Sequence, residues 1–232
     1  MSEAAARPVE KQLSPLSVLA RAGRLYRDNL ARLLAIAFVG ELFYLVGELV
    51  SHAGGNAAWW AGRALFFPGL ILYFWAGAAM IVAVAAAERG ESVSLKSCFD
   101  RVAPVFWWYV MAVVLYRLVS LVGFLLLVVM GLYWGTRYSL AGCVAVLEGP
   151  SRDPGPLSRS GRLVRGSFWR VLIPLLAVLI PGVAVPVLAG VVLDLHDFEF
   201  SLLAGVWWMA LWPLWTGVHV VIYRLLSSCE SF

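Results

Sequence analysis

The sequence predicts an all-α, polytopic membrane protein with six transmembrane helices in one bundle and amphipathic helices at the membrane surface. Composition is the first indication, because 62% of the 232 residues are hydrophobic and only 14% are charged. Soluble domains are about half apolar and about a quarter charged. Several uninterrupted apolar runs also reach the ~20 residues that a spanning helix needs. Basic amphipathic segments precede some of these runs, which is typical of a chain that enters a membrane from an anionic surface.

The most regular basic segment is 157–172, with the sequence LSRSGRLVRGSFWRVL. Its arginines recur at every third residue and its apolar residues at every third or fourth, so a helix would carry them on opposite sides. A similar helix is predicted to start at Pro15. We expect the arginines of both segments to bind anionic lipid headgroups; the alternative is that they are solvated and only set the topology. These residues are Arg21, Arg24, Arg27, Arg159, Arg162, Arg165 and Arg170.

Six apolar runs define the expected spanning helices. They lie at about 30–50, 64–87, 105–119, 124–147, 171–192 and 202–225. No long polar loop separates the third run from the fourth, and we place a tight hairpin at 120–123, with 131–135 as the alternative. A single membrane domain then covers 15–226, between a disordered cytoplasmic tail at 1–14 and a short cytoplasmic tail at 227–232.

The distribution of positive charge orients the chain. Fifteen of the 18 Lys and Arg residues lie before residue 33, within 88–101, within 152–170 or after residue 223, whereas the opposite loops hold only Arg63 and Arg117. Positive charge stays on the cytoplasmic side of membrane proteins. Sixteen of the 18 Lys and Arg residues of the chain are arginine, which fits a GC-rich bacterial genome. We therefore expect a bacterial inner-membrane protein with both termini in the cytoplasm.

A shift of 138 residues aligns the first basic segment with the third. Eight of the sixteen positions from Leu19 to Leu34 are then identical to 157–172, and Arg21 falls on Arg159. A weaker middle copy aligns at a shift of 62. We interpret the pattern as a threefold repeat of one interfacial helix plus a helical hairpin. The alternative is that basic interfacial helices resemble one another by composition alone.

Three features of the second half form a motif: Arg137 within the fourth run, the Glu-Gly pair 148–149 at its end, and R-S-x-x-L-x-R-G at 159–166. In this motif the chain resembles the YciC-type group of bacterial membrane proteins, which is related to the membrane domain fused to some glycerophosphodiester phosphodiesterases. The resemblance implies six helices and no known chemistry. Gly161 departs from the pattern, because the group usually has an aromatic residue there.

Two charged residues, Glu41 and Arg137, fall near the middle of predicted spans. An isolated charge at that depth costs at least ~2.5–3.5 kcal/mol, so we expect the two side chains to pair across the first and fourth helices. The pair would either fix helix register or line a path for a lipid or an ion. His219, in the last span, is a candidate cavity residue; the alternative is a hydrogen-bonded packing residue.

The sequence favours a protein without enzymatic activity, cofactor or metal. Its three histidines lie on different segments, so the spacing of a metal site is missing, and no phosphate-binding glycine loop or nucleophile elbow is present. The cysteines Cys98, Cys143 and Cys229 form no CxxC pair. An acidic cluster at 194–199 is expected to set topology, with a weak divalent-cation contact as the alternative.

These observations lead to two hypotheses of function. The first is a non-catalytic inner-membrane protein that organises lipid or a membrane-protein partner, or a homo-oligomer, with its basic helices on anionic headgroups and no role in nucleic-acid binding. The second is a transporter or permease for a lipid-like or small amphiphilic substrate, with a polar cavity around Glu41, Arg137 and His219. A membrane enzyme ranks third.

Overall fold

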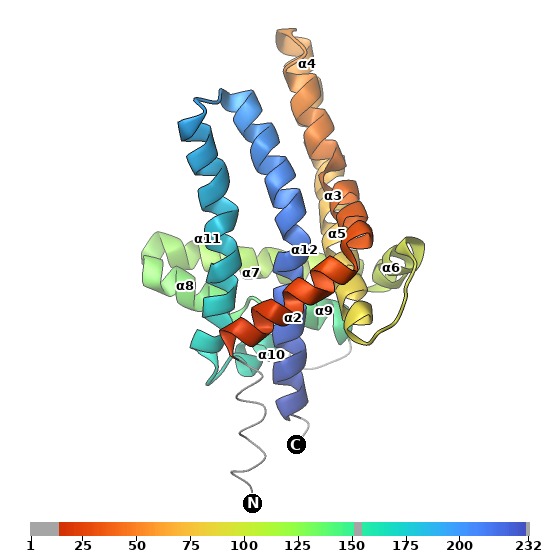
Figure 1. Ribbon diagram of the computed structural model, residues 1–232, viewed down its shortest axis with the longest axis vertical. Helices are drawn as coiled ribbons and strands as arrows, with labels where there is room; N and C mark the ends of the chain where they lie inside the picture. Colours follow the sequence, from red (N-terminus) through yellow and green to blue (C-terminus); the bar gives the residue numbers. More distant parts are fainter. Residues whose placement is uncertain (1–13, 151–154, 231–232) are drawn as a thin grey trace, which may run out of the picture.

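The computed structural model describes residues 14–150 and 155–230, and this part of the chain consists of helices joined by short turns, without a strand (Figure 1). Its helices are α2 (Pro15–Asp28), α3 (Leu30–Ser51), α4 (Gly55–Ala64), α5 (Phe66–Glu88), α6 (Leu95–Val102), α7 (Phe106–Leu126), α8 (Val128–Arg137), α9 (Ala141–Leu147), α10 (Pro156–Leu163), α11 (Phe168–Val192) and α12 (Asp197–Glu230); the short 3₁₀ helix η1 (Ala103–Val105) joins α6 to α7. The all-α fold class predicted from the sequence is confirmed.

Five stretches are long and apolar enough to cross a membrane. They are Leu30–Ser51, Gly55–Glu88, Leu95–Leu126, Phe168–Val192 and Asp197–Ser228. Their positions agree with five of the six predicted runs, because uninterrupted apolar length is a direct sequence signal for a spanning helix. The protein therefore has the composition and helix lengths of a multi-pass membrane protein.

The count of six spans is not confirmed, because the predicted fourth span is two short helices. At a rise of 1.5 Å per residue, the ten residues of α8 extend about 15 Å and the seven of α9 about 10 Å, well short of a ~30 Å hydrocarbon core. The chain reverses at Leu127, whose extended backbone (φ −159°, ψ 137°) separates α7 from α8. Both predicted positions of the hairpin, 120–123 and 131–135, are therefore wrong.

Glycine is the physical reason for this error. The two glycines that suggested turns, Gly123 and Gly131, instead lie against each other where α7 packs on α8. A Cβ atom on Gly123 would stand 2.9 Å from the Cα atom of Gly131, so a larger side chain would push the helices apart. Figure 1 shows α7 and α8 running across the long helices α11 and α12. The glycines serve helix packing and not chain reversal.

A short amphipathic helix precedes three of the long helices: α2 precedes α3, α6 precedes α7, and α10 precedes α11. The start of α2 at Pro15 agrees with the prediction, and Ser14 caps it by accepting a hydrogen bond from the backbone N–H of Ser17 (3.3 Å). The single helix predicted over 157–172 is wrong. Gly166 adopts a left-handed backbone (φ 83°) and separates α10 from α11.

The termini of the helices gather at two ends of the molecule. At one end, called here the basic end, α2, α5 and α12 meet through Arg21, Glu88 and Arg224. At the opposite end, the turn after α3 meets the start of α12, where the rings of His52 and Phe198 lie 4.5 Å apart. The predicted tail at 227–232 begins as helix, because α12 continues to Glu230. Of the predicted tail at 1–14, only Ser14 lies within the described residues.

Candidate functional site

The charges at the basic end are held in two buried clusters. In the first, the carboxylate of Glu88 at the end of α5 is only 2% exposed and meets two arginines. Nη2 of Arg21 lies 2.8 Å from its Oε1, and Nε of Arg224 lies 3.1 Å from its Oε2. Arg224 also donates to the backbone carbonyl of Ala85 (3.2 Å). This cluster joins α2, α5 and α12.

The second cluster is centred on Glu148, the residue that follows α9. Its Oε1 accepts a hydrogen bond from the hydroxyl of Tyr223 (2.8 Å) and one from Nε of Arg159 (3.3 Å). Tyr223 and Arg224 are neighbours on α12, so this helix contacts both buried carboxylates. The cluster therefore joins α9, α10 and α12 beside the first one.

Arg21 and Arg159, which the 138-residue shift aligns, occupy similar surroundings, because each pairs with a buried glutamate that ends a helix of small residues. The connections differ, however. Glu88 follows Arg21 in the chain, whereas Glu148 precedes Arg159. The threefold repeat thus stays a prediction.

The structure corrects the predicted pair of Glu41 and Arg137. Among the described residues, no salt bridge joins them, because α3 packs against α5 and α12 while α8 packs against α7 and α11. Arg137 instead donates from Nη1 to the hydroxyl of Tyr133 (2.6 Å), and its guanidinium lies over the rings of Tyr133 and Tyr138. Glu41 is 7% exposed and faces a pocket between α3 and α5.

The seven arginines predicted to bind headgroups divide into three groups. Arg21 and Arg159 pair with buried carboxylates, and Arg159 has only 18% of its side chain exposed. Arg170 is half-buried. The remaining four are exposed at or near the basic end: Arg24, Arg27, Arg162 and Arg165.

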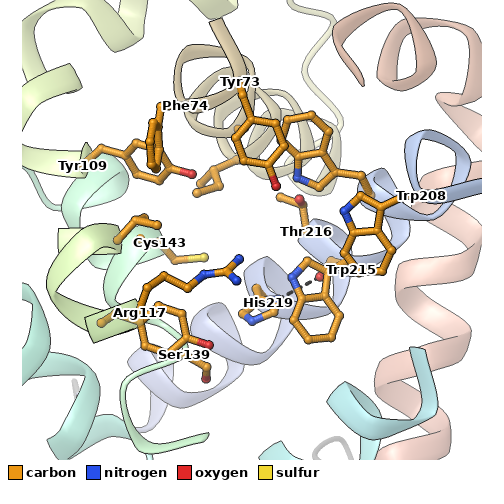
Figure 2. A pocket seen from close by; sticks show the side chains of 16 residues that line it. Tyr73, Phe74, Tyr109, Arg117, Ser139, Cys143, Trp208, Trp215, Thr216 and His219 are labelled. Atoms are coloured by element: carbon orange, nitrogen blue, oxygen red, sulfur yellow. Dashed lines mark hydrogen bonds between the residues drawn. The ribbon is translucent and has the colours of Figure 1, made fainter. Parts of the chain in front are cut away.

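Polar and aromatic side chains line a cavity of about 100 Å³ between α5, α7, α9 and α12. Figure 2 shows the Arg117 side chain reaching into it, with the hydroxyl groups of Tyr73 and Tyr109 directed inward. Three tryptophans of α12 form one wall. The polar and aromatic lining residues are Tyr73, Phe74, Tyr109, Tyr116, Arg117, Ser139, Cys143, Trp208, Trp212, Trp215, Thr216 and His219.

His219, the predicted cavity residue, lines this space and is held by its own helix. Its Nδ1 lies 2.8 Å from the backbone carbonyl of Trp215, and since a carbonyl only accepts, Nδ1 carries the proton. In the neutral ring, Nε2 is then an acceptor. The ring also stands edge-on to the Trp215 indole, with centroids 4.7 Å apart.

Arg117 is the permanent positive charge of the cavity. No salt bridge to it forms within residues 14–150 and 155–230, and neither Asp nor Glu is among the described residues that line the cavity. The guanidinium carbon of Arg117 lies 5.9 Å from the centroid of the Tyr116 ring. A cation surrounded by hydroxyl donors and no carboxylate is chemically suited to an anion.

An apolar groove of about 480 Å³ adjoins the cavity and shares four of its lining residues, Tyr116, Arg117, Trp208 and Trp215. The rest of its lining comes from the α7–α8 hairpin and from successive turns of α11. These residues are Ser120, Leu121, Phe124, Gly131, Leu132, Gly135, Thr136, Leu172, Leu175, Leu176 and Leu179. Arg117 thus stands where a polar space meets an apolar one.

The cavity lies level with the amphipathic helix α2. The hydroxyl of Tyr26 donates to the backbone carbonyl of Ala210 (3.0 Å), and Gly217 lies beside Ala22. The stretch of α12 between these contacts also carries Trp212, Trp215 and Thr216 of the cavity wall.

Sequence reasoning missed Arg117 by assigning it to a loop on the outer side. The placement followed from the hairpin predicted at 120–123; moving the reversal to Leu127 puts Arg117 inside α7. The available signal was the apolar run on both sides of Arg117, since an arginine within such a run marks a functional candidate by default.

No three His, Cys, Asp or Glu side chains come together as a metal-binding group within the described residues. In the acidic cluster at 194–199, Glu199 accepts a hydrogen bond from the backbone N–H of His196 (3.1 Å) and so caps the start of α12.

Comparisons with protein families, curated proteins and solved structures find no match, so the resemblance to the YciC-type group stays a prediction.

Proposed function

We propose that this protein is a non-catalytic membrane protein that holds an anionic lipid, or another anionic amphiphile, between its helices. Arg117 binds the headgroup, and the groove between α7, α8, α11 and α12 holds the hydrocarbon chain. The observation that carries the proposal is a single arginine that has no acidic partner among the described residues and lies where a polar cavity joins an apolar groove.

The chemistry of the two spaces supports an amphiphile. A guanidinium binds phosphate or carboxylate through two parallel N–H donors, and the hydroxyls of Tyr73, Tyr109 and Thr216 add further donors. The groove volume of about 480 Å³ lies in the range of typical ligand sites, ~300–1,000 Å³. The leucines of α11 offer a hydrocarbon chain an apolar surface.

The exposed arginines near the basic end support the same conclusion. Each basic residue near an anionic membrane surface contributes about 1 kcal/mol of attraction. Arg24, Arg27, Arg162 and Arg165 would therefore enrich anionic lipid around the helices that border the cavity.

Lipid co-purification tests the proposal. Wild-type protein and the Arg117→Gln variant are purified in a neutral detergent and offered phosphatidylglycerol, palmitate or phosphatidylcholine, and bound lipid is counted by native mass spectrometry. We expect wild type to retain one of the two anionic compounds in preference to phosphatidylcholine. Arg117→Gln should lose at least about tenfold in affinity, the range for one charge-assisted contact.

The matched control is Arg101→Gln, which removes an exposed arginine from α6 outside the cavity. It should retain lipid as wild type does. Preference for phosphatidylglycerol identifies a phosphate headgroup, and preference for palmitate identifies a carboxylate. Equal retention by wild type and Arg117→Gln would contradict the proposal. If the protein instead moves the lipid across a reconstituted vesicle membrane, it is a transporter and does not only hold the lipid.

A further inference from the structure

Four glutamates of the described chain have buried side chains, and three of them meet an arginine. Glu48 lies 3.2 Å from Nη1 of Arg63, Glu88 meets Arg21 and Arg224, and Glu148 meets Arg159. Glu41 is the exception. Only 7% of it is exposed, and it makes no hydrogen bond or ion pair with any described residue.

A pocket of about 200 Å³ between α3 and α5 lies next to Glu41. Three aromatic residues, Tyr44, Phe66 and Tyr73, line it together with Leu70 and two glycines. The ring of Tyr73 is fixed from behind, because it stacks on Trp212 with centroids 4.5 Å apart. The pocket therefore has one acidic group and firm aromatic and aliphatic walls.

We propose that this pocket binds the ammonium group of an organic amine that carries an apolar chain. The ammonium group would supply the positive counter-charge that Glu41 lacks, as arginine does for the other three glutamates. Aromatic faces attract cations through their quadrupole, and this attraction grows when the site is desolvated. The apolar walls then accept the carbon chain of the amine.

The amine site is separate from the anion site at Arg117 and opposite in charge. Tyr73 is the residue that both lining sets share, and it stands between Glu41 on one side and Arg117 on the other. The inference does not depend on the proposed function. Loss of amine binding in a Glu41 variant and loss of anionic lipid in an Arg117 variant are independent results.

The experiment measures binding of octylammonium to the full-length protein in a neutral detergent at about pH 8, where a primary amine is cationic. Thermal stabilisation is recorded against concentration, with octanol and octanoate as probes of the same chain length. A second readout on wild type is labelling by a membrane-soluble carbodiimide. This reagent adds to a protonated carboxyl and forms an N-acylurea on Glu41 without a leaving group, which peptide mass spectrometry detects.

Saturable stabilisation by octylammonium, but not by octanol or octanoate, is the expected result. Glu41→Gln should weaken binding at least about tenfold, while Glu91→Gln, which changes an exposed carboxyl, and Arg117→Gln should bind as wild type. Octylammonium should also lower the total modification of Glu41, counted as the N-acylurea plus the octylamide that the amine forms with the activated carboxyl as the urea leaves. Equal binding by wild type and Glu41→Gln overturns the proposal. Carbodiimide labelling of Glu41 that octylammonium does not reduce also overturns it, because Glu41 would then bind a proton but no amine. The labelling result decides the matter if Glu41→Gln does not fold.

Discussion

At the basic end, the buried carboxylates of Glu88 and Glu148 each meet at least one arginine, whereas inside the bundle Glu41 and Arg117 meet no opposite charge among the described residues. The two regions contain the same chemical groups. They differ in whether the protein itself supplies the counter-charge.

Under the two binding proposals, this difference separates structural charges from ligand-binding ones. A buried charge with a partner contributes to the folded state mainly because removing either partner leaves the other unpaired. A charge without a partner costs free energy until something else neutralises it. Mutations at the basic end should therefore lower the stability of the fold, whereas mutations of Glu41 and Arg117 should lower ligand binding.

The largest expected effect comes from breaking the Glu88 cluster. Glu88→Ala leaves Arg21 and Arg224 without their shared partner, and we expect the free energy of unfolding to fall by about 3 kcal/mol. Both arginines are partly exposed, at 43% and 30% of their side chains, so water offsets part of the cost. Denaturant unfolding in detergent measures the change. Glu91→Ala, at an exposed position, is the control, and an equal loss in both variants would argue against a structural role for the cluster.

Tyr223→Phe should have a smaller effect of the same sign. It removes the hydroxyl that donates to Glu148 (2.8 Å) and leaves the ring in place. Hydrogen bonds to charged groups contribute about 1.5–3 kcal/mol, and we expect the lower end because Arg159 still pairs with Glu148. Tyr133→Phe removes a hydroxyl that accepts from Arg137 at a more exposed position and should cost less in the same unfolding assay. The reverse order would be inconsistent with a buried Glu148 cluster.

Arg117→Gln should leave the stability of the lipid-free protein unchanged within ~0.5 kcal/mol. No ion pair of the described chain is lost, because Arg117 is exposed and forms no salt bridge with a described carboxylate. The unfolding of delipidated wild type and variant is compared, and an anionic lipid is then added to both proteins. Only wild type should gain stability from an anionic lipid. If the lipid-free variant is destabilised as much as Glu88→Ala, Arg117 stabilises the fold and is not a ligand-binding charge.

The smallest effect is expected outside the spanning segments, at Glu91. A hydrogen bond from the Arg89 guanidinium lowers the pKa of the exposed Glu91 carboxyl below its ordinary value of 4.5. A carboxyl with a lowered pKa stabilises the folded state above its unfolded pKa, and this contribution is lost as the pH falls through the folded pKa. Wild type should therefore lose slightly more stability than Glu91→Gln between about pH 6 and strongly acidic pH. Parallel pH curves would show that the pair contributes nothing.

Apolar length was the sequence signal that predicted the fold well. The first span was expected at about 30–50 and is found at Leu30–Ser51, because a long apolar run with a basic start has few alternatives to a spanning helix. The same signal failed between 105 and 147. There the chain reverses at Leu127 without any polar residue, and the glycines that resemble turn residues are packing contacts.

The charged sites were harder to predict, because partners come from different helices. The sequence identified Glu41 as a charge that requires compensation but assigned it Arg137, which lies on a helix that packs mainly against α7 and not against α3. It also treated Arg21 and Arg159 as exposed surface residues. Hydropathy and periodicity place a residue on a face of a helix, but they do not determine which other helix that face meets.

The contact of Tyr223 with Glu148 also fixes the lining of the Arg117 cavity. Thr216, His219 and Tyr223 are spaced at intervals of three and four residues, so they project from one face of α12. Arg224, about 100° further around the helix, is held by Glu88. Two attachments in different directions oppose any twisting of α12 about its own axis, and such a twist would turn His219 and Thr216 away from the cavity.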